Sequence, residues 1–257
     1  MNVMSGVLYL VPTPIGNLGD ISQRMAETLE QVDFIAAEDT RVTIKLLNHL
    51  ELKKPMISYH RHNTEQSGQA ILSRILNGEH CALVTDAGTP AISDPGEELV
   101  ALCAANDVTV VSIPGPCALV TALAASGQPT GRFTFEGFLA MNKKNRRRHL
   151  EQLKGEERTM IFYEAPHKLL ATLNDFQSAF GGERSISLCR EMTKLHEEVL
   201  RMTLAEAVQY YENNQPKGEF VLVLRGAEPQ QEQELTREDA LEQVERWRAE
   251  EGLSLRD

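Results

Sequence analysis

Glu38 and Asp39 bring two carboxylates to the end of an apolar run, Phe34 to Ala37, and Arg41 follows two residues later. A carboxylate at such a position can accept a proton from a hydroxyl group, and a guanidinium can bind a phosphate. The structural alternative is that Asp39 or Thr40 caps a helix and that the charges form an ion pair. The residue types alone leave both interpretations open.

The segment from Asp86 to Gly96 follows another apolar run and combines two glycines, two prolines, two carboxylates and two hydroxyl groups. Glycine and proline fix an irregular backbone, and polar groups held on such a backbone suit a polar small molecule. Asp94 could instead be only the N-cap of a helix that Pro95 begins. Capping and binding are compatible, and we interpret the segment as a binding loop.

Two more loops contain residues that allow a ligand to approach the backbone, Pro12 to Asp20 and Ile113 to Leu119. Neither has the spacing G-x-G-x-x-G, and G-x-x-x-x-G-K-[ST] occurs nowhere in the chain, which argues against a phosphate cradle. The first loop could also be a stiff connector. Cys117 has no base near it in sequence, so we interpret it as a small buried side chain rather than a nucleophile.

The chain lacks the patterns of a metal site or a disulfide framework. Cys81, Cys103, Cys117 and Cys189 contain no C-x-x-C pair, which disfavours a zinc ribbon and a secreted scaffold. The segment His196-Glu197-Glu198 lacks the second histidine of H-E-x-x-H. We therefore expect no metal.

Strands and helices alternate along the first half of the chain. Apolar runs predict strands over 7–11, 34–37, 82–84 and 108–113, and helical spacing predicts helices over 22–32, 40–50, 69–76 and 97–105. Continuous apolar strands between helices indicate a mostly parallel sheet covered on both faces. Ligands of such sheets bind beyond the carboxyl ends of the strands, where the loops described above begin.

The second half predicts a mixed α/β arrangement. We expect a helix over 117–126, strands over 133–135, 160–163, 186–188 and 220–224, and helices over 167–180 and 204–213. A length of 257 residues favours two domains of ordinary size. We therefore predict an α/β protein with domains over 1–117 and 118–226, followed over 227–257 by a polar linker and the start of a helical region.

The charge of the chain is acidic on average and basic in one place. The formal net charge of −11 argues against indiscriminate binding of nucleic acid. A basic cluster nevertheless occupies six consecutive positions and contains Lys143, Lys144, Arg146, Arg147 and Arg148. A solvated charged loop is the alternative, but we expect the cluster to contact phosphates.

Val108 to Gly131 runs for 24 residues without a charge, which is long enough to span a bilayer. Its internal prolines and glycines favour a strand, a tight loop and a buried helix instead. The first residues show neither the basic nor the apolar region of a signal peptide. We expect a cytoplasmic protein with no membrane partner.

Eight segments occur in one order along about residues 7–225: LVPTPIGNLGDIS (10–22), AAEDTR (36–41), VTDAGTPAISDPG (84–96), IPGPCALVTALAASG (113–127), FEGFL (135–139), FYEAPHK (162–168), CREMTKLHEE (189–198) and KGEFVLV (217–223). Together they resemble the tetrapyrrole methylase superfamily, the class III S-adenosylmethionine methyltransferases. Within it they are most similar to the bacterial enzymes that methylate a cytidine ribose of small-subunit ribosomal RNA. The chain departs from that pattern at Ala140-Met141-Asn142 and at Lys168, outside the cofactor loops.

The resemblance implies two α/β domains with S-adenosylmethionine in the cleft between them, a homodimer and a further helical region, of which 227–257 would be a truncated beginning. It implies cofactor contacts at Pro14, Asp86, Ala87, Gly88, Ile92, Ser93, Asp94, Pro116, Cys117, Ala118, Tyr163, Glu164, Ala165, Lys217, Gly218 and Glu219. The chemistry agrees, because adenine, a ribose diol, a zwitterion and a sulfonium need backbone polar groups and carboxylates rather than a phosphate cradle.

The implied reaction moves a methyl group to a ribose 2′-hydroxyl of 16S ribosomal RNA within the small subunit. Alignment supplies much of such catalysis, and a nearby acceptor for the hydroxyl proton helps. Asp20, Glu38 and Asp39 are the candidate carboxylates. We hypothesise that Asp39 orients or deprotonates the hydroxyl and that Arg41 positions the RNA. The basic cluster would bind phosphates, with Arg24, Arg61 and His62 extending the surface.

Two other functions fit the same loops. One is a tetrapyrrole C-methyltransferase, against which the basic cluster and the segment 37–41 argue. The other is a ribosome-binding factor without catalytic activity, against which the complete loops in both halves argue.

Overall fold

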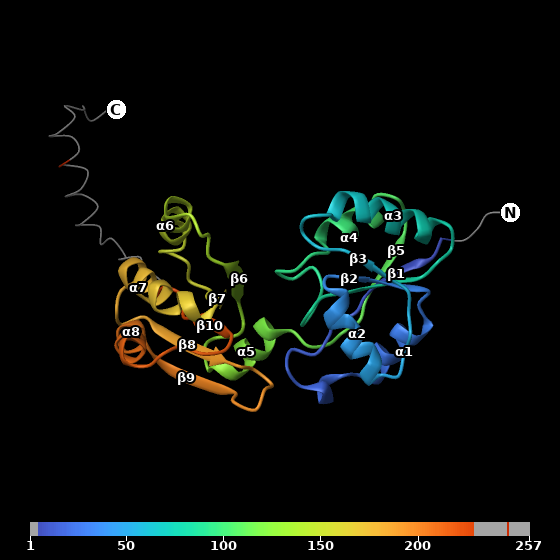
Figure 1. Ribbon diagram of the computed structural model, residues 1–257. Coiled ribbons are helices and arrows are strands. Elements are labelled where there is room, and N and C mark those ends of the chain that lie inside the picture. Colours follow the sequence, from blue (N-terminus) through green and yellow to red (C-terminus); the bar gives the residue numbers. More distant parts are fainter. Residues whose placement is uncertain (1–4, 229–245, 247–257) are drawn as a thin grey trace, which may run out of the picture. The chain divides into compact units, whose positions relative to one another are not determined.

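The computed structural model describes residues 5–228 and residue 246, and its strands form two five-stranded sheets (Figure 1). Residues up to Gly226 belong to one compact unit. The domain boundary between 117 and 118 therefore stays a prediction. The helical region expected after Thr236 lies outside the described residues, except for Arg246.

The first sheet is parallel throughout, as the alternation of strands and helices predicts. Its order is β3-β2-β4-β1-β5. The strands are β1 (Val7–Leu10), β2 (Phe34–Ala37), β3 (Met56–Ser58), β4 (Cys81–Val84) and β5 (Thr109–Ser112). The sequence does not predict β3, because three residues beside two lysines and a proline give no apolar run of useful length.

Helices cover both faces of this sheet (Figure 1). Helices α1 (Gln23–Gln31) and α2 (Thr40–His49) pack on one face with α1 residue Leu29 and α2 residue Leu47. Helices α3 (Thr64–Leu76) and α4 (Glu97–Ala104) cover the other face, where Ile75 and Leu99 are buried. Burial of such side chains contributes about 1.5–3 kcal/mol each, which holds the strand ends at fixed positions.

The second half forms an α/β arrangement, as predicted; its sheet contains parallel and antiparallel pairs, and its order is β6-β7-β10-β8-β9. The strands are β6 (Phe133–Phe138), β7 (Thr159–Glu164), β8 (Ser185–Arg190), β9 (Glu198–Thr203) and β10 (Phe220–Leu224). Only the β6–β7 pair is parallel. The edge strand β9 was not predicted, because its charged residues obscure the apolar alternation.

Helix α5 (Ala118–Ser126) packs on one face of the second sheet, and α6 (Lys143–Gln152), α7 (Leu169–Phe180) and α8 (Leu204–Asn213) pack on the other (Figure 1). The basic cluster lies on α6 and not on a loop, and four of its five cations are exposed, so contact with phosphates stays a prediction. Asn142 caps this helix through its Oδ1, which accepts hydrogen bonds from the amides of Lys144 and Asn145. The sequence did not predict this helix, because its single buried residue, Leu150, follows a run of cations and gives no apolar spacing.

The uncharged stretch Val108 to Gly131 forms β5, a tight loop and α5, as expected. Over the described ranges, the longest apolar helix is too short to cross a bilayer. Two short 3-10 turns, η1 (Leu18–Asp20) and η2 (Pro166–Lys168), complete the elements near the strand ends.

Candidate active site

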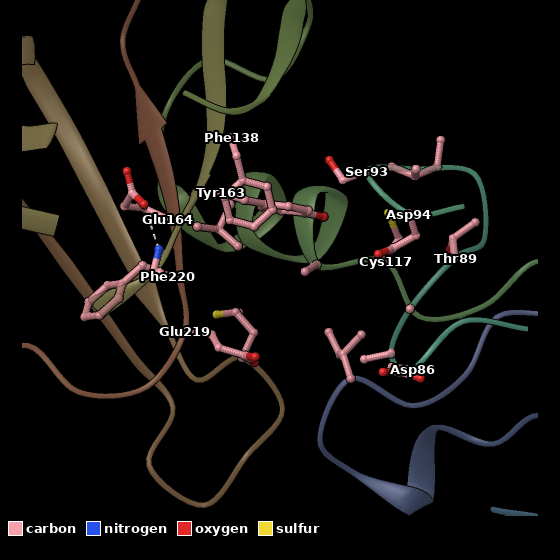
Figure 2. A pocket seen from close by; sticks show the side chains of 18 of the residues that line it. Asp86, Thr89, Ser93, Asp94, Cys117, Phe138, Tyr163, Glu164, Glu219 and Phe220 are labelled. Carbon is pink, nitrogen blue, oxygen red and sulfur yellow. Dashed lines mark hydrogen bonds between the residues drawn. The ribbon is translucent and has the colours of Figure 1, made fainter. Parts of the chain in front are cut away.

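A cavity of about 490 Å³ lies where loops that follow strands of both sheets meet. Figure 2 shows Ser93, Asp94 and Cys117 on one side of it and Tyr163 and Glu164 on the other. Its volume is in the range of small-molecule and cofactor sites. The lining residues are Ile15, Glu38, Asp86, Ala87, Gly88, Thr89, Ile92, Ser93, Asp94, Cys117, Ala118, Phe138, Tyr163, Glu164, Ala165, Pro166, Cys189, Met192, Lys194, Glu219, Phe220 and Val221.

Hydrogen bonds join the three loops that follow β1, β4 and β5. Thr13 and Gly88 exchange two backbone hydrogen bonds of 2.9 Å, and the Thr13 hydroxyl donates to the Thr85 carbonyl at 3.0 Å. The Thr89 hydroxyl donates to the Pro116 carbonyl at 2.8 Å. These contacts tie the loops to one another and give the first wall of the cavity a fixed backbone.

The loop from Asp86 to Gly96 is held in a strained conformation. Ala91 and Ser93 have φ values of 66° and 64°, which side-chain-bearing residues adopt at a cost. Arg61 donates a hydrogen bond to the Ser93 carbonyl and so braces the strained segment. The N-cap of α4 is Gly96, without a side-chain cap, so the alternative that Asp94 caps this helix is wrong.

Three carboxylates, those of Glu38, Asp86 and Asp94, line this wall. The Glu38 side chain accepts from the Asp86 amide at 3.4 Å, and the Asp86 side chain accepts from the Asp39 amide at 3.2 Å. Burial raises the pKa of Glu38 and of Asp86. Burial, reinforced by the charge of Glu38, raises the pKa of Asp94 to about 6. Negative charge accumulates here at a cost that a bound cation would offset.

Asp39 lies next to this cluster but does not line the cavity. It is the N-cap of α2 and accepts from the Arg41 amide at 2.8 Å. The Arg41 guanidinium also donates to both carboxylate oxygens, at 3.0 Å and 2.6 Å. These hydrogen bonds lower the pKa of Asp39 to about 2. The cap and the ion pair of the structural alternative are both present, and the catalytic role of Asp39 stays a prediction.

The second wall is built on the end of β7. The Tyr163 hydroxyl oxygen accepts from the Leu119 amide at 3.1 Å, near the start of α5. Phe138 packs edge-on against the Tyr163 ring at a centroid distance of 5.6 Å. Glu164 is buried, and its Oε1 accepts from the Ala165 amide at 2.8 Å. Figure 2 shows Glu164 beside Phe220, its antiparallel partner in β10.

Lys194 is the one cation among the described residues that line the cavity. Its ammonium donates to Glu191 and Glu219, both at 2.8 Å. Its aliphatic stem lies so close to Gly16 that a Cβ there would be 2.3 Å from the Lys194 Cγ. Glycine at position 16 therefore permits the loop after β1 to approach the loop after β8.

Most of the predicted cofactor residues come together in this cavity. Those that line it are Asp86, Ala87, Gly88, Ile92, Ser93, Asp94, Cys117, Ala118, Tyr163, Glu164, Ala165 and Glu219. Pro14, Pro116 and Gly218 do not line it, and Lys217 lines a separate, smaller cavity. Whether any of these residues binds a cofactor stays a prediction.

The other predicted residues are placed as follows. Glu38 lines the cavity, and Asp20 is exposed on η1. Arg24 and His62 are exposed, as are Lys143, Lys144, Arg147 and Arg148 of the basic cluster. Arg146 differs from its neighbours, because its side chain is 13% exposed and forms an ion pair with Asp175.

Sequence reasoning did not single out several lining residues. They are Ile15, Thr89, Phe138, Pro166, Cys189, Met192, Lys194, Phe220 and Val221. Thr89 lies within the predicted binding loop, and Phe138, Met192 and Lys194 lie within segments that carry the family resemblance. Their position within those segments is the sequence feature that could have identified them as lining residues. No group of three or more His, Cys, Asp or Glu residues in the described part of the chain is arranged to hold a metal ion.

Comparisons with known proteins agree with this architecture. The family model of the Tetrapyrrole (Corrin/Porphyrin) Methylases matches residues 7–208. A protein of Synechocystis sp. named ribosomal RNA small subunit methyltransferase I is 52% identical over 93% of this chain and 86% of its own length.

Solved structures show the fold at lower identity. The methyltransferase CobJ superposes with a TM-score of 0.66 and 16% identity, over 87% of this chain and 95% of its own. The uroporphyrin-III C-methyltransferase of Thermus thermophilus, complexed with S-adenosylhomocysteine, gives a TM-score of 0.59 and 14% identity, over 85% and 97% of the two chains. With the family model and the 52% identical relative, the conclusion is that this chain belongs to the tetrapyrrole (corrin/porphyrin) methylases.

Proposed function

We propose that this chain is an S-adenosylmethionine-dependent methyltransferase of small-subunit ribosomal RNA, and that it methylates the ribose 2′-hydroxyl of a cytidine in 16S ribosomal RNA. The observation that carries the proposal is the cavity of about 490 Å³ whose wall presents three carboxylates and a fixed backbone. The name of the 52% identical relative supports the RNA substrate. The 2′-hydroxyl of cytidine comes from the family resemblance of the segments.

The cavity fits the cofactor in charge and in polarity. Glu38, Asp86 and Asp94 complement a ligand that carries a sulfonium and an ammonium group. Ile92 and Met192 add apolar surface suited to an adenine ring. When bound, S-adenosylmethionine supplies an electrophilic methyl group.

Among the candidate carboxylates, we assign the acceptor of the hydroxyl proton to Glu38. It lines the cavity, and its raised pKa makes it a stronger base than Asp39, whose pKa is about 2. Asp39 then acts by holding Arg41, whose side chain is 88% exposed and keeps further donors for a phosphate beside its ion pair with Asp39. This assignment modifies the hypothesis that Asp39 itself removes the proton.

The RNA-binding surface includes the exposed cations of α6, which are Lys143, Lys144, Arg147 and Arg148. Each phosphate neutralised by such a side chain releases a counterion, so binding weakens as salt rises. Arg24, Arg41 and His62 are exposed and extend the candidate surface. The homodimer is also part of this proposal, and sedimentation of the purified chain tests it.

The test is mass spectrometry of nucleosides from undermethylated small ribosomal subunits incubated with the protein and S-adenosylmethionine. We expect new 2′-O-methylcytidine with the wild type and a strong loss with Glu38→Gln. Glu212→Gln, which removes an exposed carboxylate from α8, is the matched control. Binding of S-adenosylhomocysteine without any methylated nucleoside would favour the non-catalytic factor. Methylation of a tetrapyrrole in place of RNA would favour the C-methyltransferase.

A further inference from the structure

Helix α6 has two faces of different character. Lys143, Lys144, Arg147 and Arg148 are exposed. Arg146, His149 and Leu150, spaced three and four residues apart, share a face that is half-buried to buried. On that face Leu150 is buried in the core of the second sheet, and His149 lies 2.8 Å from the Glu136 carboxylate. One residue of the basic cluster therefore points away from the surface that the other four form.

The Arg146 guanidinium is engaged by two partners on α7. Its Nε donates to Asp175 Oδ2 at 2.5 Å, and its Nη2 donates to Thr172 Oγ1 at 2.9 Å. The Arg146 side chain is 13% exposed, and Thr172 is fully buried. An arginine that contacts RNA needs an accessible guanidinium, whereas this one is largely buried and directs two donors to α7.

The hydrogen bonds continue from Thr172 to the wall of the cavity. The Thr172 hydroxyl donates its single proton to Glu164 Oε2 and accepts from Arg146 with its lone pair. Glu164 is 4% exposed, and its second oxygen accepts from the Ala165 amide. Both Glu164 and Ala165 line the cavity. A continuous path thus runs from α6 through α7 to the end of β7.

We propose that Arg146 is a positioning residue that fixes Glu164 and the adjoining Ala165 backbone through Thr172, and that it does not contact RNA. This inference rests on the proposed function, because it takes the cavity as the cofactor site. A cation at the far end of the path polarises the Thr172 hydroxyl and strengthens its bond to the buried Glu164 carboxylate. Without it, a buried carboxylate loses support and the wall it carries is free to shift.

The experiment measures S-adenosylhomocysteine binding to the full chain by calorimetry. We expect Arg146→Met and Thr172→Val each to weaken binding about fivefold, the effect of one hydrogen bond. Because both changes interrupt one path, their effects should not add. The affinity of the double variant is expected to equal that of the single variant with the lower affinity. Arg146→Lys keeps one donor and is expected to recover part of the affinity.

Two control variants separate this role from its alternatives. Thr28→Val removes another buried threonine hydroxyl, which donates to the Arg24 carbonyl at 2.7 Å on α1, and is expected to leave the affinity unchanged. Arg147→Met removes a cation from the exposed face of α6. It is expected to leave S-adenosylhomocysteine affinity unchanged and to reduce the salt slope of small-subunit binding by about one. Arg146→Met should leave that slope unchanged.

The outcomes are distinct. If Arg146→Met flattens the salt slope as Arg147→Met does and spares S-adenosylhomocysteine binding, Arg146 is an RNA contact and the inference is wrong. If Arg146→Met and Thr172→Val lower only the melting temperature, the path is merely structural and the inference is also wrong. A wild-type chain that binds no S-adenosylhomocysteine would overturn the proposed function itself.

Discussion

We predict that Asp94 makes the affinity for a cationic cofactor depend on pH. Its pKa is raised from the ordinary value of 3.8 to about 6, first by burial and then by the charge of Glu38. Among the described residues, the charge of Arg61 is what opposes the shift. A sulfonium or ammonium bound in the cavity favours the ionised form and therefore lowers this pKa.

The size of the effect follows from the pKa before and after binding. Below about pH 6 the free protein holds a proton on Asp94, and binding of S-adenosylmethionine must release it. If the bound cation returns the pKa to 3.8, the affinity at about pH 5 is about tenfold lower than at about pH 7.5. Above about pH 7 the carboxyl is already ionised, so the affinity is expected to be constant.

Calorimetric titration with S-adenosylmethionine and with S-adenosylhomocysteine at several pH values measures this directly. The second ligand lacks the sulfonium charge, so its affinity should vary less with pH. Asp94→Asn mimics the protonated carboxyl, so it should bind S-adenosylmethionine on the order of a hundredfold more weakly than the wild type at about pH 7.5 and should show no loss on acidification. Glu212→Gln, at an exposed position of α8, should retain the wild-type profile.

Two results would refute this reasoning. An S-adenosylmethionine affinity that is constant between about pH 5 and about pH 7.5 would show that Asp94 does not face the cationic part of the ligand. A wild-type pH profile in Asp94→Asn would assign the proton to another carboxylate of the cavity, such as Asp86 or Glu38.

Three further predictions concern stability and transfer. Burial of Asp94 disfavours its ionised form, so the stability that this residue contributes falls as pH rises from about 4 to about 6. Asp94→Asn should therefore raise the melting temperature at neutral pH. A lower melting temperature would contradict this. Gly96 has φ +146°, and a Cβ at this position would lie 2.9 Å from the Leu83 side chain. Gly96→Ala should therefore lower the free energy of unfolding, measured by urea titration, by about 1–3 kcal/mol. An unchanged urea midpoint would contradict this expectation of strain. Asp39→Asn retains an oxygen that can cap α2 but loses the ion pair with Arg41. Methyl transfer should therefore fall while S-adenosylhomocysteine binding is retained. Full methyl transfer in this variant would remove Asp39 from the proposed function.

The sequence predicts the parallel sheet well, and the reason is the burial of its strands. All four residues of β2 and of β4 are buried, so each strand is a continuous apolar run that ends where the loop begins. In contrast, five of the six residues of the edge strand β9 are half-buried and Arg201 is exposed, and α6 exposes most of its cations. Elements at the periphery are stabilised by tertiary contacts that a local pattern does not contain.

The residues of the candidate site also differ in how well the sequence predicts their positions. Glu38 and Asp86 come just after β2 and β4, so the sequence places both at the carboxyl edge of the sheet, and the pairing of these two strands brings them into contact. Lys194 comes to the cavity from a loop after β8, and only the fold brings its stem beside Gly16. The inward direction of Arg146 is likewise absent from the composition of the basic cluster, because it depends on Thr172 and Asp175 of α7.

The distribution of charge explains how an acidic chain can serve two ligands of opposite sign. The formal net charge of −11 opposes a polyanion at long range, yet fields decay within about 8–10 Å at physiological salt. At contact distance, we propose that the exposed cations of α6 determine the interaction with phosphates. The carboxylates of the cavity instead favour a cation, because burial raises their pKa values and a bound positive charge would offset that cost. We therefore propose that the exposed face of α6 selects phosphates and that the cavity selects a cation, each by its local charge. Arg146 points away from the exposed face of α6 and supports the wall of the cavity.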